Sequence, residues 1–220
     1  MPTAKQLEIA QQKNAWDFGN DILYQLCRDN FLHISDDEIL TKVLFIGRIY
    51  AAAVERRKNK LDEINDFFYL STVVPAFKKS KIDKELDALR SMKVREIESI
   101  KSALQVHYYL TNMLKQITLL NKRSFSSKYL HFHLPELFYI YDSRAVNALR
   151  KFSSRIPEDL KNILKFENID LEYAKFYCKC FDLKRHIKSE VNITLTNREL
   201  DKLLINEANS LNKKKRKYKD

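Results

Sequence analysis

The sequence predicts an all-α fold, a compact multi-helix domain for which two helical subdomains flanking a cleft are one expected arrangement. Two observations predict it. The chain has only two glycines and four prolines among 220 residues, whereas sheets depend on tight turns that are rich in both. Apolar residues recur at helical spacing along most of the chain, and hydrophobic residues make up 45% of it, enough for a packed core.

Two long helices are expected in the first quarter of the chain. The first covers residues 4–29. The residues of its apolar stripe are Trp16, Ile22, Leu23 and Leu26. The second begins after Ser35, because this residue precedes Glu38 by three positions and the pair has the spacing of a capping box. It should run through 51–53 and end in the cations after Glu55, since cations stabilise a helix C-terminus.

Apolar spacing predicts further helices before the middle of the chain. A short aromatic helix should end before Pro75, because the residue before a proline avoids the helical conformation. The three expected ranges are 62–72, 81–91 and 94–119.

The next segment should turn and re-enter a helix. The turn falls at 121–123, the helix should begin at Ser124 or Ser126, and Pro135 should stop it. An extended apolar piece is expected over 138–141.

Asp142 should then cap a helix that reaches about Phe152, because an aspartate oxygen accepts from the first free amides of a helix. Pro157 should occupy the first position of the following helix. An aromatic-rich helix is expected over 170–189, and Thr196 should open the last one in capping-box spacing. The expected organisation is one helical subdomain over 1–92, a second over 93–212 and a disordered basic tail over 213–220.

The charge of the chain favours a polyanionic partner. The formal net charge is +11 and the isoelectric point is about 9.4. Phosphates bind cationic surfaces because counterions are released, so nucleic acid or a nucleotide is the expected partner. Gly-rich phosphate loops are absent from the sequence, and we expect no cofactor.

The cysteines indicate a reducing compartment. Their odd number and the absence of a signal peptide or a membrane-spanning apolar run predict a cytoplasmic protein with no membrane association. Cys178 and Cys180 are two positions apart, which suits no zinc knuckle, so we expect buried free thiols and no metal site.

Arg123–Arg144 is the segment that carries candidate chemistry. Lys128 follows small hydroxyl residues at a helix start, where the positive end of the helix dipole disfavours the ammonium form. Such a lysine is a candidate amine nucleophile. Asp142, held as the cap of the next helix, is a candidate for stabilising a developing positive charge or moving protons.

This order of a turn, a lysine at a helix start, a short apolar run and an aspartate at the next helix start resembles the helix-hairpin-helix DNA glycosylases. The likeness is to the 8-oxoguanine DNA glycosylase branch and its small bacterial relatives in anti-phage operons. The resemblance implies that Lys128 attacks C1′ of a damaged nucleotide and that Asp142 assists in base excision. It also implies a helix-hairpin-helix in 93–212 and makes DNA the expected nucleic acid before RNA. The hairpin of the family contains two glycines, whereas Leu120–Lys128 contains none.

Other residues are candidates for substrate or nucleic-acid contact. The candidates are Arg123, Ser124, Ser126, Ser127, Tyr129, His131, His133, Arg144, Arg48 and Tyr50. His131 and His133 diverge on a helix and should be satisfied by hydrogen bonds. Arg48 lies among apolar residues, so it should pair with Glu55, Asp17 or a ligand phosphate, on a helix that either packs closely through Gly47 or lines the pocket.

Three functions remain open at this level. The first is a DNA glycosylase, with or without lyase activity, that acts on a modified or flipped purine. The second is a nucleic-acid-binding protein that kept the fold and lost the chemistry, which the glycine-free turn favours. The third is a helical adaptor of a defence operon, whose basic face would meet an acidic protein or a nucleotide.

Overall fold

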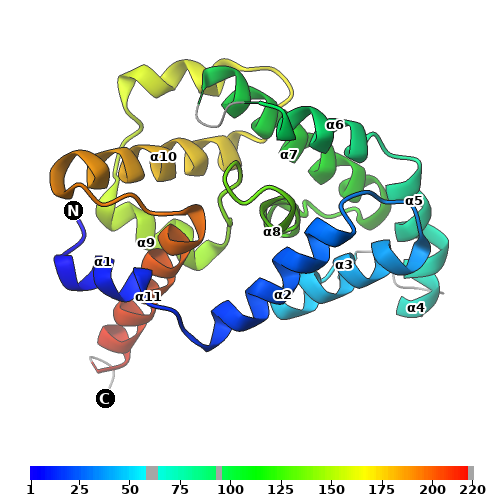
Figure 1. The fold of residues 1–220 in the computed structure, drawn as a ribbon, viewed down its shortest axis with the longest axis horizontal. Coiled ribbons are helices and arrows are strands. Elements are labelled where there is room, and N and C mark those ends of the chain that lie inside the picture. The colour runs from blue at the N-terminus through cyan, green and yellow to red at the C-terminus, as the bar shows by residue number, and fades with distance from the viewer. Residues whose placement is uncertain (58–63, 93–95, 218–220) are drawn as a thin grey trace. The chain divides into compact units, whose positions relative to one another are not determined.

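Helices account for all regular structure in the computed structural model, which describes residues 1–57, 64–92 and 96–217 (Figure 1). The all-α prediction is therefore confirmed for this part of the chain. The chain divides into two units, each with its own core. One unit combines 1–14, 139–167 and 171–220, and the other combines 15–138 with 168–170. The division falls elsewhere than the expected boundary after residue 92, because the first helix packs with the last one.

The unit of residues 15–138 is built around a buried helix. Its elements are α2 (Ala15–Asp29), α3 (Asp36–Ile49), α4 (Asn65–Phe68), the π-helix η1 (Tyr69–Val73), α5 (Val74–Lys78), α6 (Ile82–Arg90), α7 (Ile97–Thr118) and α8 (Arg123–His133). Helix α8 packs against α2, α3 and α7. Every residue from Phe125 to His133 is buried, so α8 is the centre of this core.

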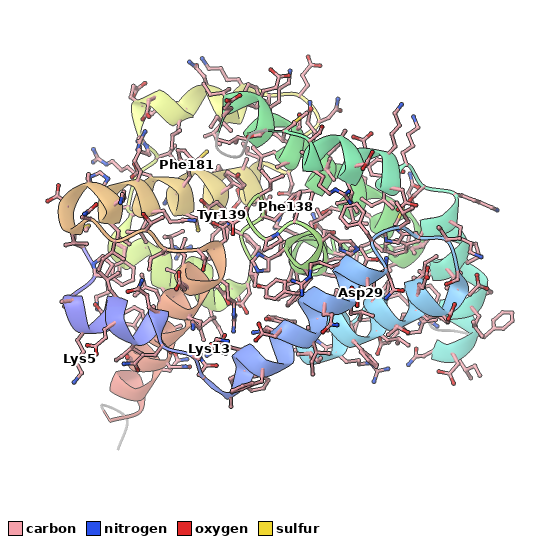
Figure 2. All side chains as sticks on the ribbon, in the orientation of Figure 1. Lys5, Lys13, Asp29, Phe138, Tyr139 and Phe181 are labelled. Carbon is pink, nitrogen blue, oxygen red and sulfur yellow. The ribbon has the colours of Figure 1, made fainter. Side chains whose placement is uncertain are left out.

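The other unit gathers both ends of the chain. Its elements are α1 (Ala4–Gln11), α9 (Ser143–Phe152), the 3-10 helix η2 (Glu158–Lys165), α10 (Leu171–Val191) and α11 (Asn197–Lys217). Helix α11 packs against α9 and α1, while α10 packs against α9 and η2. Apolar side chains fill the interior, whereas charged ones such as Lys5 project outward (Figure 2).

The prediction of one helix over 4–29 is wrong. Helix α1 ends at Gln11, α2 begins at Ala15, and the two helices belong to different units. The stripe expected on it is only partly buried. Leu23 is 1% exposed, but Trp16 and Ile22 are 69% and 66% exposed. The buried face of α2 instead includes the polar residues Asp17 and Asn20.

Helix α3 begins at the expected capping box of Ser35 and Glu38 but ends earlier than expected. It stops at Ile49 because Ala51 takes a left-handed conformation, with φ 50°. The amide of Ala52 then bonds to the carbonyl of Gly47 at 2.8 Å, which closes the helix end. Ala51 and its two successors therefore lie outside the helix.

Two proline expectations also need correction. Pro75 does not end the helix, because the backbone stays helical from Asn65 to Lys78 through α4, η1 and α5, and Pro75 follows the π-helical turn η1 inside this stretch. Pro157 precedes η2 as its N-cap residue rather than its first residue, and the helix is 3-10 rather than α. The remaining helices from 81 onward begin and end within about three residues of expectation, apart from η2. The backbone is helical through Lys217, so most of the expected disordered tail continues α11.

Candidate functional site

The turn between α7 and α8 reverses the chain without a glycine. Leu119 ends α7 in the left-handed region, with φ 57°, a conformation that usually falls to glycine. The Thr118 hydroxyl lies 3.2 Å from the amide of Leu120, and the Asn121 side chain accepts from the amide of Arg123 at 3.0 Å. Side chains therefore satisfy the backbone amides of Leu120 and Arg123 in this turn.

The two cationic side chains of this turn, Lys122 and Arg123, both form hydrogen bonds with other groups of the protein. The Lys122 ammonium donates to the carbonyls of Ala53, at 3.0 Å, and Arg56, and burial lowers its pKa to about 8. Arg123 donates through Nε to both oxygens of the buried Asp170, at 2.9 and 2.7 Å. Neither side chain is presented to a phosphate in this conformation.

Lys128 is the sixth residue of α8 and lies in its second turn, within the first two turns that the sequence predicted. The helix dipole acts mainly on the first turn, so its influence on this amine is weaker than the sequence suggested. The side chain is buried, at 2% exposed, and its Nζ donates to the Ser124 hydroxyl at 2.6 Å. Nζ also lies 5.9 Å from the centre of the Tyr50 ring.

Tyr50 links Lys128 to a second polar group. Its hydroxyl donates to Oδ1 of the buried Asn20 at 2.6 Å. Among the described residues, Nδ2 of Asn20 has no hydrogen-bond partner. A buried amide donor without a partner costs free energy, which a ligand carbonyl or hydroxyl would recover. Lys128, Ser124, Tyr50 and Asn20 form what we call the Lys128 cluster.

The other serines near Lys128 are buried. Ser127 donates its hydroxyl to the Ser124 carbonyl at 3.0 Å, which ties the first turn of α8 together. Oγ of Ser126 is buried without a hydrogen-bond partner among the described residues.

Asp142 caps α9 as the sequence predicted. Its Oδ1 accepts from the amides of Arg144 and Ala145, at 2.8 and 3.0 Å. The second carboxylate oxygen has no hydrogen-bond partner among the described residues and is left for other contacts. Arg144, another candidate, is exposed and donates to Asn209 of α11. Asp142 belongs to the unit of 139–167, whereas Lys128 belongs to the unit of 15–138.

Arg48 pairs with Glu55, one of the partners that the sequence offered, at 2.7 Å. The geometry differs from the expectation of a buried arginine, because its side chain is 60% exposed while that of Glu55 is 10% exposed. Glu55 also accepts from the Tyr69 hydroxyl. A Cβ at Gly47 would stand 3.2 Å from Cα of Ala53 and 3.5 Å from the Phe125 ring of α8, so there is no room for a larger residue. Close packing through Gly47 therefore explains this part of α3.

The two candidate histidines have different surroundings. Nδ1 of His131 donates to the Phe138 carbonyl at 2.8 Å, so Nε2 of the neutral ring accepts from the Tyr24 hydroxyl at 2.6 Å. Both of its nitrogens are used, as expected. Nδ1 of His133 donates to the Tyr129 carbonyl at 2.8 Å, but its Nε2 has no partner among the described residues. Burial holds the pKa of His133 well below its usual value.

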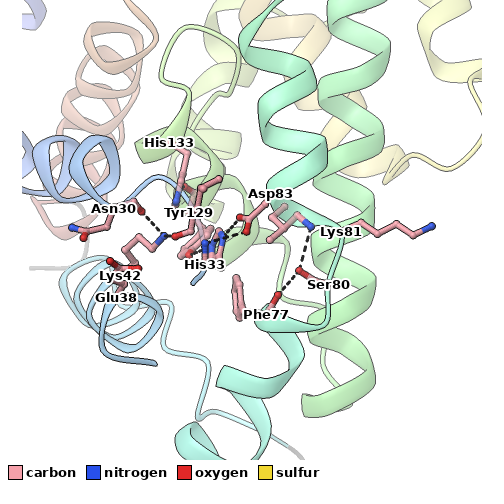
Figure 3. Close-up of polar contacts among 12 residues, drawn as sticks. Asn30, His33, Glu38, Lys42, Phe77, Ser80, Lys81, Asp83, Tyr129 and His133 are labelled. Carbon is pink, nitrogen blue, oxygen red and sulfur yellow. Dashed lines mark hydrogen bonds and ion pairs between the residues drawn. The ribbon is translucent and has the colours of Figure 1, made fainter. Parts of the chain in front are cut away.

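Sequence reasoning missed a buried network that joins three segments of this unit (Figure 3). His33 bonds through Nδ1 to Asp83, and its Nε2 lies 2.6 Å from the Tyr129 hydroxyl. Burial lowers the pKa of His33 more than Asp83 raises it. Tyr129, a candidate for substrate contact, is fully buried here. No local spacing signals such a network, because its members are 50 and 96 positions apart.

Lys42 lies beside this network and is fully buried. Its Nζ donates to the carbonyls of Asn30 and Leu32 at 2.6 and 2.8 Å, which fixes the chain between α2 and α3 (Figure 3). Burial lowers the pKa of Lys42 to about 8. His33, Tyr129 and Lys42 are buried, whereas the side chain of Asp83 is 38% exposed; the network holds the position of His33.

The cysteines are free and buried, as predicted. Burial raises the pKa of Cys27 and of Cys178 to about 12, so both thiols remain protonated at neutral pH. The described residues contain no group of three or more His, Cys, Asp or Glu side chains placed to hold a metal ion. Nor is any helix among them long and apolar enough to cross a bilayer.

Comparisons with known proteins give no match. No protein-family model matches the chain, and neither the curated proteins nor the solved structures contain a match to it.

Proposed function

We propose that the chain is a DNA glycosylase with lyase activity, in which the Lys128 amine attacks C1′ of a flipped, modified purine nucleotide and Asp142 assists. The observation that carries the proposal is the Lys128 cluster. It combines a buried amine held by a hydroxyl with the unpartnered amide donor of Asn20. Burial disfavours the charged form of an amine, and the neutral amine is the nucleophile, so the burial of Lys128 supports this role.

The proposed reaction needs only the Lys128 amine, a proton acceptor and the nucleotide, and its bonds and protons balance as follows. The lone pair of the amine forms a bond to C1′, and the bond from C1′ to the base breaks. The base leaves with that electron pair and takes up a proton. The nitrogen then gives one proton to the departing base or to a carboxylate. Its lone pair forms the double bond to C1′ as the bond from C1′ to O4′ breaks, O4′ takes up a proton, and the opened sugar is left as a protonated Schiff base. Asp142 would stabilise the positive charge on the sugar or accept a proton through its second oxygen.

Two features bear on substrate entry. Lys128 is almost fully buried, so a nucleotide reaches it only if neighbouring side chains move aside. The net charge of +11 supports attraction to the DNA backbone, although Lys122 and Arg123 are engaged elsewhere. Separate variants of Lys128 and Asp142 test the two proposed roles independently.

Borohydride trapping tests the lyase chemistry. Duplex DNA with an abasic site or 8-oxoguanine should give a covalent complex with the protein, and Lys128→Gln should abolish it. Lys84→Gln removes an exposed lysine of the same unit and should trap normally. Unfolding curves of both variants establish that they remain folded. The absence of a complex with the unaltered protein, or trapping by Lys128→Gln, would refute the proposal.

Asp142→Asn tests the second residue without removing the cap, because asparagine caps helices as well as aspartate does. Base excision should slow by about a hundredfold or more, the usual contribution of a positioned proton-transfer group. An unchanged rate would remove Asp142 from the mechanism.

A second candidate is a nucleic-acid-binding protein of the same fold that lacks the chemistry. The burial of Lys128, together with the internal bonds of Lys122 and Arg123, favours it. In that case DNA binding weakens with salt, no base is released, and the double variant Lys128→Gln/Asp142→Asn binds as the unaltered protein does.

A further inference from the structure

A cavity of about 610 Å³ lies within the unit that contains both ends of the chain. It is formed by α9, the loop that follows it, η2 and α10. Its size is within the range of pockets that bind small organic ligands. Neither Lys128 nor Asp142 lines it.

The charged groups around this cavity leave an excess of positive charge. The charged lining residues are Arg150, Arg155, Lys161, Lys175, Lys179, Glu158 and Glu172. Each carboxylate already has a lysine partner: Glu158 pairs with Lys161 at 2.5 Å, and Glu172 pairs with Lys175 at 2.9 Å.

The two arginines differ from the lysines. Lys179 donates to the Ser154 carbonyl at 3.0 Å, across the cavity wall. Arg150 and Arg155 are exposed, and neither guanidinium pairs with a carboxylate among the described residues. Guanidinium groups bind phosphate oxygens through paired N–H donors, so these two side chains can hold an anion.

The wall of the cavity also has an aromatic part. Tyr141 and Phe176 pack edge to face there, with ring centres 5.2 Å apart, and Leu149 and Val146 extend the apolar surface. A ligand that matches both parts has a flat aromatic group and a phosphate. We propose that this cavity binds a nucleotide, with its phosphate at Arg150 and Arg155 and its base against Tyr141 and Phe176. The site is independent of the proposed glycosylase chemistry.

Calorimetric titration of the full chain at low salt tests this site. Adenosine monophosphate should bind, adenosine should bind at least about tenfold more weakly, and Arg150→Gln/Arg155→Gln should weaken the nucleotide about tenfold or more. The control Lys5→Gln/Lys188→Gln removes two positive charges from the same unit outside the cavity and should leave the affinity nearly unchanged. Equal losses in both double variants would show an effect of net charge only and overturn the proposal, as would no binding at millimolar nucleotide.

The aromatic contact has its own test. Tyr141→Ala should weaken binding of adenosine monophosphate and leave that of inorganic phosphate unchanged, whereas equal effects on both would contradict the assigned orientation.

Short oligonucleotides with and without a 5′ phosphate distinguish a free nucleotide from a strand end. A strand-end site requires that the terminal phosphate strengthens binding and that the arginine variant removes this gain. A free-nucleotide site requires that neither oligonucleotide competes with adenosine monophosphate. If both oligonucleotides compete with adenosine monophosphate equally well, the strand-end site and the free-nucleotide site are both overturned.

Discussion

The Tyr129 hydroxyl lies 2.6 Å from Nε2 of His33, inside the core of the unit of residues 15–138. Because His33 donates through Nδ1 to Asp83, its Nε2 accepts the hydroxyl proton of Tyr129. The bond joins the chain after α2 to the centre of α8, while Asp83 holds the start of α6 to the same ring. Three segments that are distant in sequence are thus connected through one imidazole.

Tyr129→Phe should destabilise the protein. The substitution leaves Nε2 of His33 buried without a donor, which costs about 1–3 kcal/mol. Urea unfolding measures the change. Tyr108→Phe is a matched control, because Tyr108 is only half-buried and its hydroxyl makes no hydrogen bond among the described residues, so it should change stability by less than about 0.5 kcal/mol. Equal effects of the two variants would contradict the role given to the His33 bond.

Stability should fall as the pH decreases below 6.5. The pKa values of His33 and His133 are lower in the folded protein than their ordinary value of 6.5, and that of His107 is lowered to about 4, in each case chiefly by burial. Below pH 6.5 the unfolded chain therefore binds more protons than the folded one, and acid favours unfolding. Each histidine contributes a slope of at most about 1.4 kcal/mol per pH unit.

Urea midpoints between pH 7.5 and 4.5 measure this slope. The variant His133→Gln should flatten it, and replacement of the exposed His186 by Gln should not. A stability that stays level or rises as the pH decreases from 6.5 would contradict the expectation. Asp83 has a lowered pKa, so its own contribution is lost only below about pH 4 and falls outside this range.

The two glycines should respond differently to substitution. Gly19 is exposed within α2, and a Cβ added there would have no neighbouring atom within 4 Å, so Gly19→Ala should stabilise the protein by about 1 kcal/mol through helix propensity. Gly47→Leu should destabilise it by about 3 kcal/mol, because even a Cβ would stand 3.2 Å from Cα of Ala53 and 3.5 Å from the Phe125 ring. Thermal unfolding compares the two, and a neutral Gly47→Leu would show that α3 does not pack closely there.

Asp142 should also contribute to stability as the N-cap of α9, independently of any role in catalysis. Asp142→Ala removes the acceptor of two backbone amides and should cost about 1 kcal/mol, whereas Asp142→Asn should cost only a few tenths. Chemical denaturation of both variants provides the comparison. If the two variants lose the same stability, the carboxylate charge rather than the cap is responsible.

The sequence predicts those features of the fold and of the candidate site, such as helix caps, that depend on residues close together in the chain. Residue spacing predicts the caps at Ser35, Asp142 and Thr196, and each forms as expected. The end of α3 was not predicted, because a left-handed Ala51 has no sequence signature comparable to that of glycine. Helix α8 begins at Arg123, one residue before the serine that the sequence offered, so Lys128 lies within the first two turns as predicted.

The sequence by itself determined the helical class, the helix starts capped by Ser35, Asp142 and Thr196, and the free, buried state of the thiols, because each depends on composition or on groups within about four residues. Only the tertiary structure decided which polar groups are buried together. It joined Arg123 to Asp170, His33 to Tyr129 and Tyr50 to Asn20. These pairs are distant in the chain, so their hydrogen bonds form only after the helices pack, and packing is decided by the whole core rather than by any one segment.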